Sequence, residues 1–320
     1  MSTRHLVDPE LLPMIDMMAE FRVDRHSLTQ LRAMRGELFG LVAPETPPEV
    51  VHISGPEGAP AVPLRISRPP GAATGRPAIY HIHGGGFVIG DAEMGDLAAR
   101  IMADRHDALV ASVDYRLAPE TPFPGPIEDC YAGLAWLIAH AQPLGIDVER
   151  IVIMGESAGG GLAAALALMA RDRGGPMIAG QMLIYPMLDH RTGGDADPYS
   201  NERAGEFGWT RASNRFGWAS MRGVGTLNDS RAHHFSPSLA DDLAGLPPAF
   251  VAVGALDLFV DEDIDYARRL IAAGVPTELH VYPGAPHGFN VMADAAVSRR
   301  FARDLDDAMA RMLAKRAPEV

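Results

Sequence analysis

The chain has 320 residues, of which 47% are hydrophobic and 22% are charged, and its formal net charge is −13. This composition is that of a globular protein with a large core, arranged as one α/β domain or as a domain with a smaller cap. The negative charge argues against a nucleic-acid partner, because phosphates are bound by a basic surface.

Targeting, membrane and disulfide signals are weak in this sequence. Met1–His5 is followed by the mixed segment Leu6–Glu10 rather than by an apolar stretch. The longest apolar run, Gly159–Ala170, is too short to span a membrane. Cys130 is the only cysteine, which excludes an intramolecular disulfide, and its helical setting predicts a buried thiol. We therefore expect a cytoplasmic protein with no membrane partner.

Short apolar runs rich in β-branched residues alternate with helical patterns along the chain. We predict strands at 78–82, 108–113, 151–154, 181–185, 249–253 and 278–282. We predict helices at 94–106, 127–141, 158–172, 261–273 and 294–315. Because the apolar runs are continuous rather than alternating, they indicate a mostly parallel sheet that helices cover on both faces. The expected fold class is α/β.

Two stretches stand outside this alternation. Residues 8–40 hold two amphipathic helical patterns, formed by Leu11, Leu12, Ile15 and Met18 and by Leu28, Leu31, Met34 and Leu38. Residues 190–235 lack strand-like runs and hold two of the three tryptophans. We expect both stretches to form a helical cap over the carboxyl edge of the sheet, where open α/β sheets bind ligands. The alternative for 8–40 is a pair of packing helices. The chain is thus divided into an N-terminal helical cap segment, 1–45, and a main domain, 46–320, with a cap insertion at about 190–235.

A G-x-S-x-G motif lies between the predicted strand 151–154 and the predicted helix 158–172. Gly155 and Gly159 flank Ser157 at two positions on either side. This is the pattern of a nucleophile elbow, a sharp strand-to-helix turn that exposes one hydroxyl at the end of a sheet. Small residues are needed there, because a larger side chain would collide where strand and helix approach each other. The context predicts Ser157 as a nucleophile.

A serine nucleophile needs N–H donors for the developing oxyanion, and a glycine run supplies candidates. Gly84, Gly85 and Gly86 follow the predicted strand 78–82, and successive glycines let backbone N–H groups converge without side-chain obstruction. The N–H of Ala158, after the nucleophile, is the expected second half of the site. The alternatives are a flexible turn or a phosphate cradle, but a cradle would be followed by Lys and then Ser or Thr.

The base and its orienting acid are expected downstream of the serine. His287 lies on a Gly- and Pro-rich loop after the last predicted strand, where the carboxyl edge of the sheet would place it. Asp257 follows the strand 249–253 in the same way. Asp261 and Glu262 are the alternatives for the acid, but they fit the acidic first turn of a helix, which the helix dipole favours. We therefore predict His287 as the base and Asp257 as its partner.

The remaining histidines have no such placement. Most of them are expected to be solvated or packed: His5, His26, His52, His106, His140 and His190. His233 and His234 are adjacent and lie in the expected cap, where they suggest a part of the cap or a metal site. Because no Cys or paired acid lies near them in the sequence, this metal signal is weak, and we expect no metal.

Four segments in this order resemble the hormone-sensitive-lipase-like esterases of the α/β-hydrolase superfamily. They carry the sequences HGGG, DYRLAPE, GESAGG and HGF, at His83–Gly86, Asp114–Glu120, Gly155–Gly160 and His287–Phe289. The resemblance covers about residues 45–315, and the N-terminal helical stretch also suits the family's cap. It implies an α/β-hydrolase fold in which 46–320 is the catalytic domain.

The resemblance implies a carboxylic ester hydrolase that acts on short- to medium-chain acyl esters without a cofactor. The implied catalytic residues are Ser157 as nucleophile, His287 as base and Asp257 as its partner. The implied oxyanion hole comprises Gly84 in the turn and the N–H groups of Gly85, Gly86 and Ala158. The implied supporting residues are His83, Glu156 and Glu262.

Two positions depart from the family's common pattern. Glu156 stands where Asp or Thr is commoner, so the hydrogen bonding behind the elbow is left open. Leu258 follows Asp257, where many members carry Pro. In the second motif we expect Arg116 to pair with Glu120 and to hold the loop under the site, a role that suits an Arg–carboxylate fork.

The motifs do not separate ester hydrolysis from amidase, deacetylase, thioesterase or carbamate hydrolase chemistry on the same machinery. A non-catalytic small-molecule receptor on this fold would not need His287 beside an intact Ser157. A true lipase would show a large apolar lid, whereas the expected cap insertion carries many charged residues. The expected partner is a small-molecule ester, and a homodimer is compatible with the resemblance.

Overall fold

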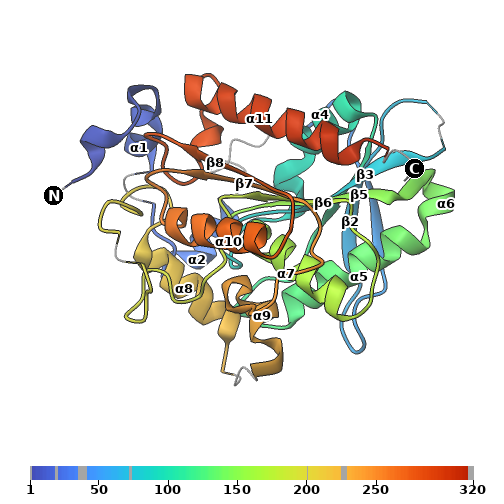
Figure 1. Cartoon of the computed structure of the whole chain (residues 1–320), viewed down its shortest axis with the longest axis horizontal. Coiled ribbons are helices and arrows are strands. Elements are labelled where there is room, and N and C mark those ends of the chain that lie inside the picture. The colour runs from blue at the N-terminus through green and yellow to red at the C-terminus, as the bar shows by residue number, and fades with distance from the viewer. Residues whose placement is uncertain are drawn as a thin grey trace.

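In the part of the chain that the structure describes, a single mixed sheet of eight strands organises the fold (Figure 1). The computed structural model describes residues 2–18, 21–34, 42–71, 74–199, 201–224 and 229–315. The strands are β1 Glu49–Ile53, β2 Val62–Ser67, β3 Arg76–Ile82, β4 Leu109–Val113, β5 Ile146–Glu156, β6 Gly180–Ile184, β7 Ala249–Gly254 and β8 Thr277–Tyr282. Their order is β1-β2-β4-β3-β5-β6-β7-β8. β2 pairs antiparallel with β1 and β4, and the remaining pairs are parallel.

Helices connect the strands and cover both faces of the sheet. They are α1 Leu12–Met17, α2 Leu28–Ala33, α4 Asp96–His106, α5 Gly125–Ala139, α6 Ala141–Leu144, α7 Ala158–Asp172, α8 Arg211–Arg222, α9 Ala232–Phe235, α10 Val260–Ala272 and α11 Ala296–Leu313. At the two patterns expected in 8–40 the described residues form the short helices α1 and α2, and Leu38, the last residue of the second pattern, lies outside the described residues. Within the described residues, the helices are too short or too polar to cross a bilayer.

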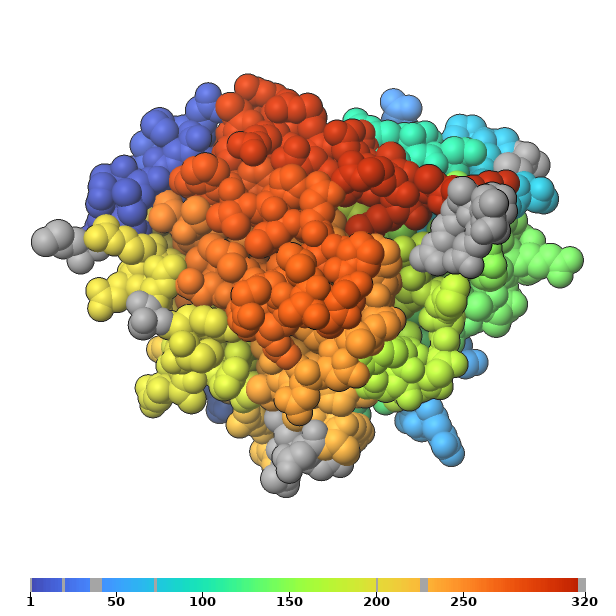
Figure 2. Space-filling model, viewed as in Figure 1, coloured from blue at the N-terminus to red at the C-terminus, as the bar shows by residue number. Residues whose placement is uncertain are grey.

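Two hydrophobic cores lie on the two sides of the sheet, because successive residues of a strand point to opposite faces. Ile79 and Val152 pack on the side covered by α4 and α11. Their neighbours Tyr80 and Ile153 pack on the side covered by α5, α7 and α10. Burial on both faces explains why the central strands are continuous apolar runs. In the space-filling view, the orange-to-red part of the chain, which includes α10 and α11, forms the centre of the visible face (Figure 2).

The α/β fold class and the six predicted strands are confirmed, whereas β1 and β2 were missing from the prediction. β1 is largely exposed at the edge of the sheet, and its sequence EVVHI mixes apolar and polar residues. β2 has Pro63 and Arg65 among its six residues. Neither strand is a continuous apolar run, since neither is buried on both faces. Helix α7 begins and ends where the sequence predicts, at residues 158 and 172.

The N-terminal segment contacts two distant parts of the chain. The N–H of Val23 donates to Oγ of Ser213 on α8 at 3.3 Å. Arg32 on α2 donates to the carbonyl oxygens of Val88 and Ala118, at 2.8 and 2.9 Å, in the loops after β3 and β4. These bonds place α2 and α8 at the carboxyl edge of the sheet, beside the glycine-rich loop.

Candidate active site

Ser157 occupies a strained turn between β5 and α7. Its φ and ψ are 55° and −120°, a conformation that non-glycine residues rarely adopt. The turn is fixed from both sides, because the Ser157 N–H donates to the Ile184 carbonyl at 2.9 Å and the Met187 N–H donates to the Ser157 carbonyl at 3.0 Å. Such strain persists only where the surroundings enforce it, and it is typical of functional sites.

The glycines around Ser157 are required by close backbone approach. A Cβ on Gly155 would lie 2.2 Å from the carbonyl oxygen of Gly159. A Cβ on Gly159 would lie 2.0 Å from the carbonyl oxygen of Ile82, at the end of β3. These close contacts explain why the motif requires small residues. They also place the elbow against β3, the strand that leads into the glycine run.

Three predicted residues meet at the carboxyl edge of the sheet. Nε2 of His287 lies 2.9 Å from Oγ of Ser157. Nδ1 of His287 lies 2.7 Å from Oδ2 of Asp257, whose other oxygen accepts the N–H of Phe259 at 3.0 Å. The three side chains come from the turns after β5, β7 and β8, whose parallel carboxyl ends share one edge. This is the nucleophile–base–acid arrangement that activates a serine.

Buried rings hold the imidazole of His287 in place. Tyr185 and Phe259 make edge-on contacts with it, with ring centroids 4.7 and 5.2 Å away, and Trp209 lies 6.4 Å away. Asp257 is completely buried, and Ser157 and His287 are 6% and 9% exposed. The environment restricts the imidazole to the orientation that serves Ser157 and leaves only a narrow access to the reacting atoms.

The glycine run lies next to the serine. A Cβ on Gly84 would be 3.5 Å from Cβ of Ser157. Gly85 and Gly86 have φ of 110° and 59°, and Gly85 accepts the N–H of Val88 and Ile89 in a tight turn. Among the described residues, no backbone hydrogen bond uses the N–H of Gly85 or Gly86. Directly after Ser157, Ala158 begins α7, so its N–H is one of those left free at a helix start. These N–H groups are available to an anion.

His83 supports the glycine run rather than the chemistry. Its Nδ1 lies 2.8 Å from the Gly84 carbonyl oxygen, and its ring stacks on Tyr115 at 4.2 Å. The Tyr115 hydroxyl donates to the His83 carbonyl at 3.0 Å. Burial lowers the pKa of His83 to about 4, so the ring is neutral and its Nδ1–H donates to Gly84.

Glu156 pairs with a histidine that the sequence prediction had not singled out. Its Oε2 lies 2.9 Å from Nε2 of His81 on β3, and Nδ1 of His81 lies 3.2 Å from Oγ of Ser112 on β4. Burial disfavours the charged imidazole, but the Glu156 carboxylate outweighs it and raises the pKa of His81. The hydrogen bonding behind the elbow, which the sequence left open, thus links the three neighbouring strands β3, β4 and β5.

Glu262 holds the segment after β6. Its Oε1 accepts the N–H groups of Leu188 and Asp189 at 2.7 and 3.3 Å, and its Oε2 accepts the hydroxyl of Thr192. Burial, and then the charge of Asp189, raise its pKa. Asp261, the other alternative for the triad acid, instead accepts the side-chain amide of Asn201 at 2.8 Å. The structure therefore places Asp257 alone of the three beside His287.

The expected pair between Arg116 and Glu120 is wrong. Arg116 forms a fork with Asp129 on α5, with Nε and Nη2 at 2.8 and 2.7 Å from its two oxygens. Glu120 pairs with Arg32 at 2.8 Å. Asp129 is completely buried and is neutralised by Arg116, whereas the Glu120 side chain is exposed and pairs with the N-terminal segment. The motif is architectural, as expected, but through partners that are distant in sequence.

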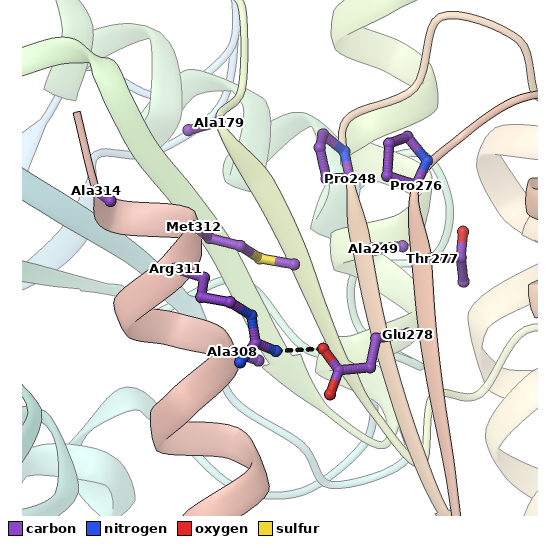
Figure 3. Close-up of a pocket in the computed structure, with 10 residues that line it drawn as sticks. All are labelled: Ala179, Pro248, Ala249, Pro276, Thr277, Glu278, Ala308, Arg311, Met312 and Ala314. Atoms are coloured by element: carbon purple, nitrogen blue, oxygen red, sulfur yellow. Dashed lines mark hydrogen bonds and ion pairs between the residues drawn. The ribbon is translucent and has the colours of Figure 1, made fainter. Parts of the chain in front are cut away.

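Other sequence features lie away from this site. Cys130 is buried, as predicted. A hollow between α11 and the strands β6 to β8 is crossed by the ion pair of Arg311 and Glu278 (Figure 3). Its residues Ala179, Pro248 and Pro276 precede those strands, so it lies at the amino edge of the sheet, opposite Ser157.

Known proteins resemble this chain over most of its length. The family described as alpha/beta hydrolase fold matches residues 79–291. Esterase LipI of Mycobacterium tuberculosis (strain H37Rv) is 37% identical over 295 residues, which cover 88% of each chain. Carboxylesterase NlhH of the same strain is 34% identical and covers 88% of this chain and 89% of its own. The solved structure of a bacterial heroin esterase is 39% identical, with a TM-score of 0.88, and the match covers 98% of this chain and 100% of that one.

The chain belongs to the α/β-hydrolase fold family, in its hormone-sensitive-lipase-like branch. Its relatives carry the names of esterases and carboxylesterases, and the chain is a hydrolase of this carboxylesterase class.

Proposed function

We propose that the chain hydrolyses short- to medium-chain carboxylic esters through an acyl-enzyme on Ser157. The observation that carries the proposal is the continuous contact from Ser157 through His287 to Asp257, at 2.9 and 2.7 Å. The free N–H groups of Gly85, Gly86 and Ala158 supply the oxyanion hole.

The reaction proceeds in two acyl transfers. Nε2 of His287 takes the proton of Ser157 as Oγ attacks the ester carbonyl, and Asp257 stabilises the imidazolium through Nδ1. His287 then gives the proton to the leaving alcohol, and a water molecule repeats the sequence on the acyl-enzyme. Each oxyanion donor contributes about 3 kcal/mol to the barrier reduction.

Trp209 supports a preference for small acyl groups. Its ring lies against the oxyanion loop, because a Cβ on Gly86 would be 2.2 Å from its edge. The ring is held there by a hydrogen-bond chain in which Nε1 donates to Asn214 at 3.1 Å and Asn214 donates to the Thr192 carbonyl at 2.7 Å. Thr192 is bonded in turn to Glu262. A fixed, bulky wall beside the oxyanion site favours short substrates.

The segments 1–45 and 190–235 act in this proposal as a cap over the site. The bond between Val23 and Ser213 joins them, and Trp209 of the second segment contacts the oxyanion loop. Polar bonds organise the second segment: Arg211 donates to the Ala204 and Asn201 carbonyls at 2.6 Å. This polar framework favours a small-ester hydrolase over a lipase with a large apolar lid.

A substrate series tests the function. p-Nitrophenyl esters with acyl chains of two to sixteen carbons should give the highest kcat/KM below ten carbons, and the matching p-nitroanilides should be turned over far more slowly. Ser157→Ala should lower kcat about a million-fold. A maximum above ten carbons would overturn the small-ester preference, and equal rates on anilides would favour an amidase.

A further inference from the structure

Two histidines and an aspartate meet on the surface at the end of α7 that lies farthest from Ser157. His233 and His234 belong to α9, which packs against α7, and Asp172 is the last residue of α7 (Figure 1). α7 has fifteen residues, so this group lies about 22 Å along the helix from the nucleophile. It has no part in the proposed ester hydrolysis.

Both imidazoles point their Nε2 atoms at one carboxylate oxygen. Oδ2 of Asp172 lies 2.7 Å from Nε2 of His233 and 2.9 Å from Nε2 of His234. The three ligand atoms all lie within 4.8 Å of one another. Oδ1 is held separately by Arg171, whose Nε and Nη2 donate at 3.0 and 2.8 Å. The carboxylate is thereby oriented with Oδ2 toward the two rings.

This donor set suits a divalent transition metal. Zn²⁺ binds imidazole nitrogen and carboxylate oxygen at about 2.0–2.1 Å, so tetrahedral ligand atoms stand about 3.3 Å apart. The two nitrogen–oxygen separations of 2.7 and 2.9 Å reach that value if each opens by about half an ångström. A water would take the fourth position. Arg171, which binds the second oxygen of Asp172, is the kind of outer-shell partner that orients a ligating carboxylate.

The arginines beside the group leave one carboxylate oxygen to the two rings. Arg171 donates to Oδ1 of Asp172, whereas Oδ2 faces His233 and His234. Arg173 follows Asp172 in the chain, and Glu128 neutralises it in an ion pair at 2.6 Å.

We propose that Asp172, His233 and His234 form a structural site for Zn²⁺ or a similar transition metal, which ties the end of the 190–235 segment to helix α7. From the sequence alone only the two histidines could be named, because Asp172 precedes His233 by 61 residues. The role is stabilisation rather than catalysis, so metal binding is independent of the esterase reaction.

Metal binding to the chelator-treated full chain tests the proposal. Calorimetry should show one equivalent of Zn²⁺ bound, with a dissociation constant of about 10 µM or below. At a hundredfold excess of Zn²⁺ over that constant, the ratio of folded to unfolded protein should rise about 100-fold, which raises the melting temperature by about 4 °C. Co²⁺ should give the intense visible absorption of a tetrahedral ion.

Variants separate this site from adventitious binding. His233→Ala should lose the bound equivalent and the melting shift, whereas His140→Ala, which removes an exposed histidine elsewhere, should keep both. Ser157→Ala should bind Zn²⁺ as the parent does. If His233→Ala does not fold, the Co²⁺ spectrum of the parent protein tests the proposal in its place. Equal binding by His233→Ala and the parent, or a weak octahedral Co²⁺ spectrum, would overturn the proposal.

Discussion

Glu156 illustrates how one residue before the nucleophile can stabilise the elbow from behind. Its carboxylate binds His81, which is 4% exposed. The bond joins β5 to β3 directly under the turn that holds Ser157. We interpret Glu156 as a positioning residue, because its contact reaches the serine only through the backbone of β5.

The pH dependence of stability tests this pair. The Glu156 charge raises the pKa of His81 above its unfolded value of about 6.5. The stabilisation is therefore fully present below about pH 6.5 and is lost as the pH rises through the raised pKa. Glu156→Gln should lower the free energy of unfolding more at about pH 5.5 than at about pH 9. Urea unfolding at the two pH values measures this, and an equal loss at both would contradict the pairing.

At the scale of elements, helix α8 and the loop before it place the ring of Trp209 beside Gly86 of the glycine run. Asn214 on α8 lies at the centre of a buried chain that runs from Glu262 on α10 to the ring of Trp209. Each member is fixed by a partner on another element. The Trp209 ring beside Gly86 is thus held by contacts between distant segments, and the proposed preference for small acyl groups rests on them.

Removing this wall should change acyl preference more than catalysis. Trp209→Ala should move the best p-nitrophenyl ester to a longer acyl chain, because it opens the space beside the oxyanion loop. Trp136→Ala is the matched control, since Trp136 lies near the end of α5 and stacks on His140, the residue after that helix. Comparison of kcat/KM along the acyl series for both variants measures the effect. An unchanged profile in Trp209→Ala would show that another surface sets the limit.

The fork between Arg116 and Asp129 connects the loop after β4 to α5. Asp129 is completely buried, and its Oδ2 also accepts the Arg116 N–H at 3.0 Å. Loss of the guanidinium leaves a buried carboxylate without its cation, which is among the costly changes in a protein. The pair is therefore a structural joint that holds the loop carrying Tyr115 under the glycine run.

Arg116→Ala should lower the free energy of unfolding by about 3 kcal/mol. Glu120→Ala should cost less than about 1 kcal/mol, because the Glu120 side chain is 63% exposed. Chemical denaturation of both variants and of Asp129→Ala provides the comparison. A large coupling energy between Arg116 and Glu120 in a double-mutant cycle would show that these two residues pair, and would contradict the fork with Asp129.

At the scale of the whole molecule, the features that local patterns encode were predictable. The buried parallel strands are apolar runs, the elbow is a strand–glycine–helix signature, and the loops carrying Asp257 and His287 follow strands whose carboxyl ends meet. Contacts that depend on tertiary packing were not predictable. The sequence offered no signal that His81 on β3 would bind Glu156 on the neighbouring strand β5. It also offered none that Arg116 would pair with Asp129. The exposed edge strands β1 and β2 were missed because half-exposed strands lack a continuous apolar run.

The assembly of the site explains why three residues separated by up to 130 positions act as one unit. The sheet brings the ends of β5, β7 and β8 to one edge, and in the proposed function the segments 1–45 and 190–235 form a cap over it. The central claim is that this edge holds a single activated serine.

Covalent labelling tests that claim most directly. Diethyl p-nitrophenyl phosphate transfers a phosphoryl group to an activated serine, so intact mass spectrometry of the parent should show one adduct per chain, located on the peptide that contains Ser157. Ser157→Ala should remain unlabelled under the same conditions, and His287→Ala should label far more slowly. An adduct on another residue, or equal labelling of Ser157→Ala, would contradict the account.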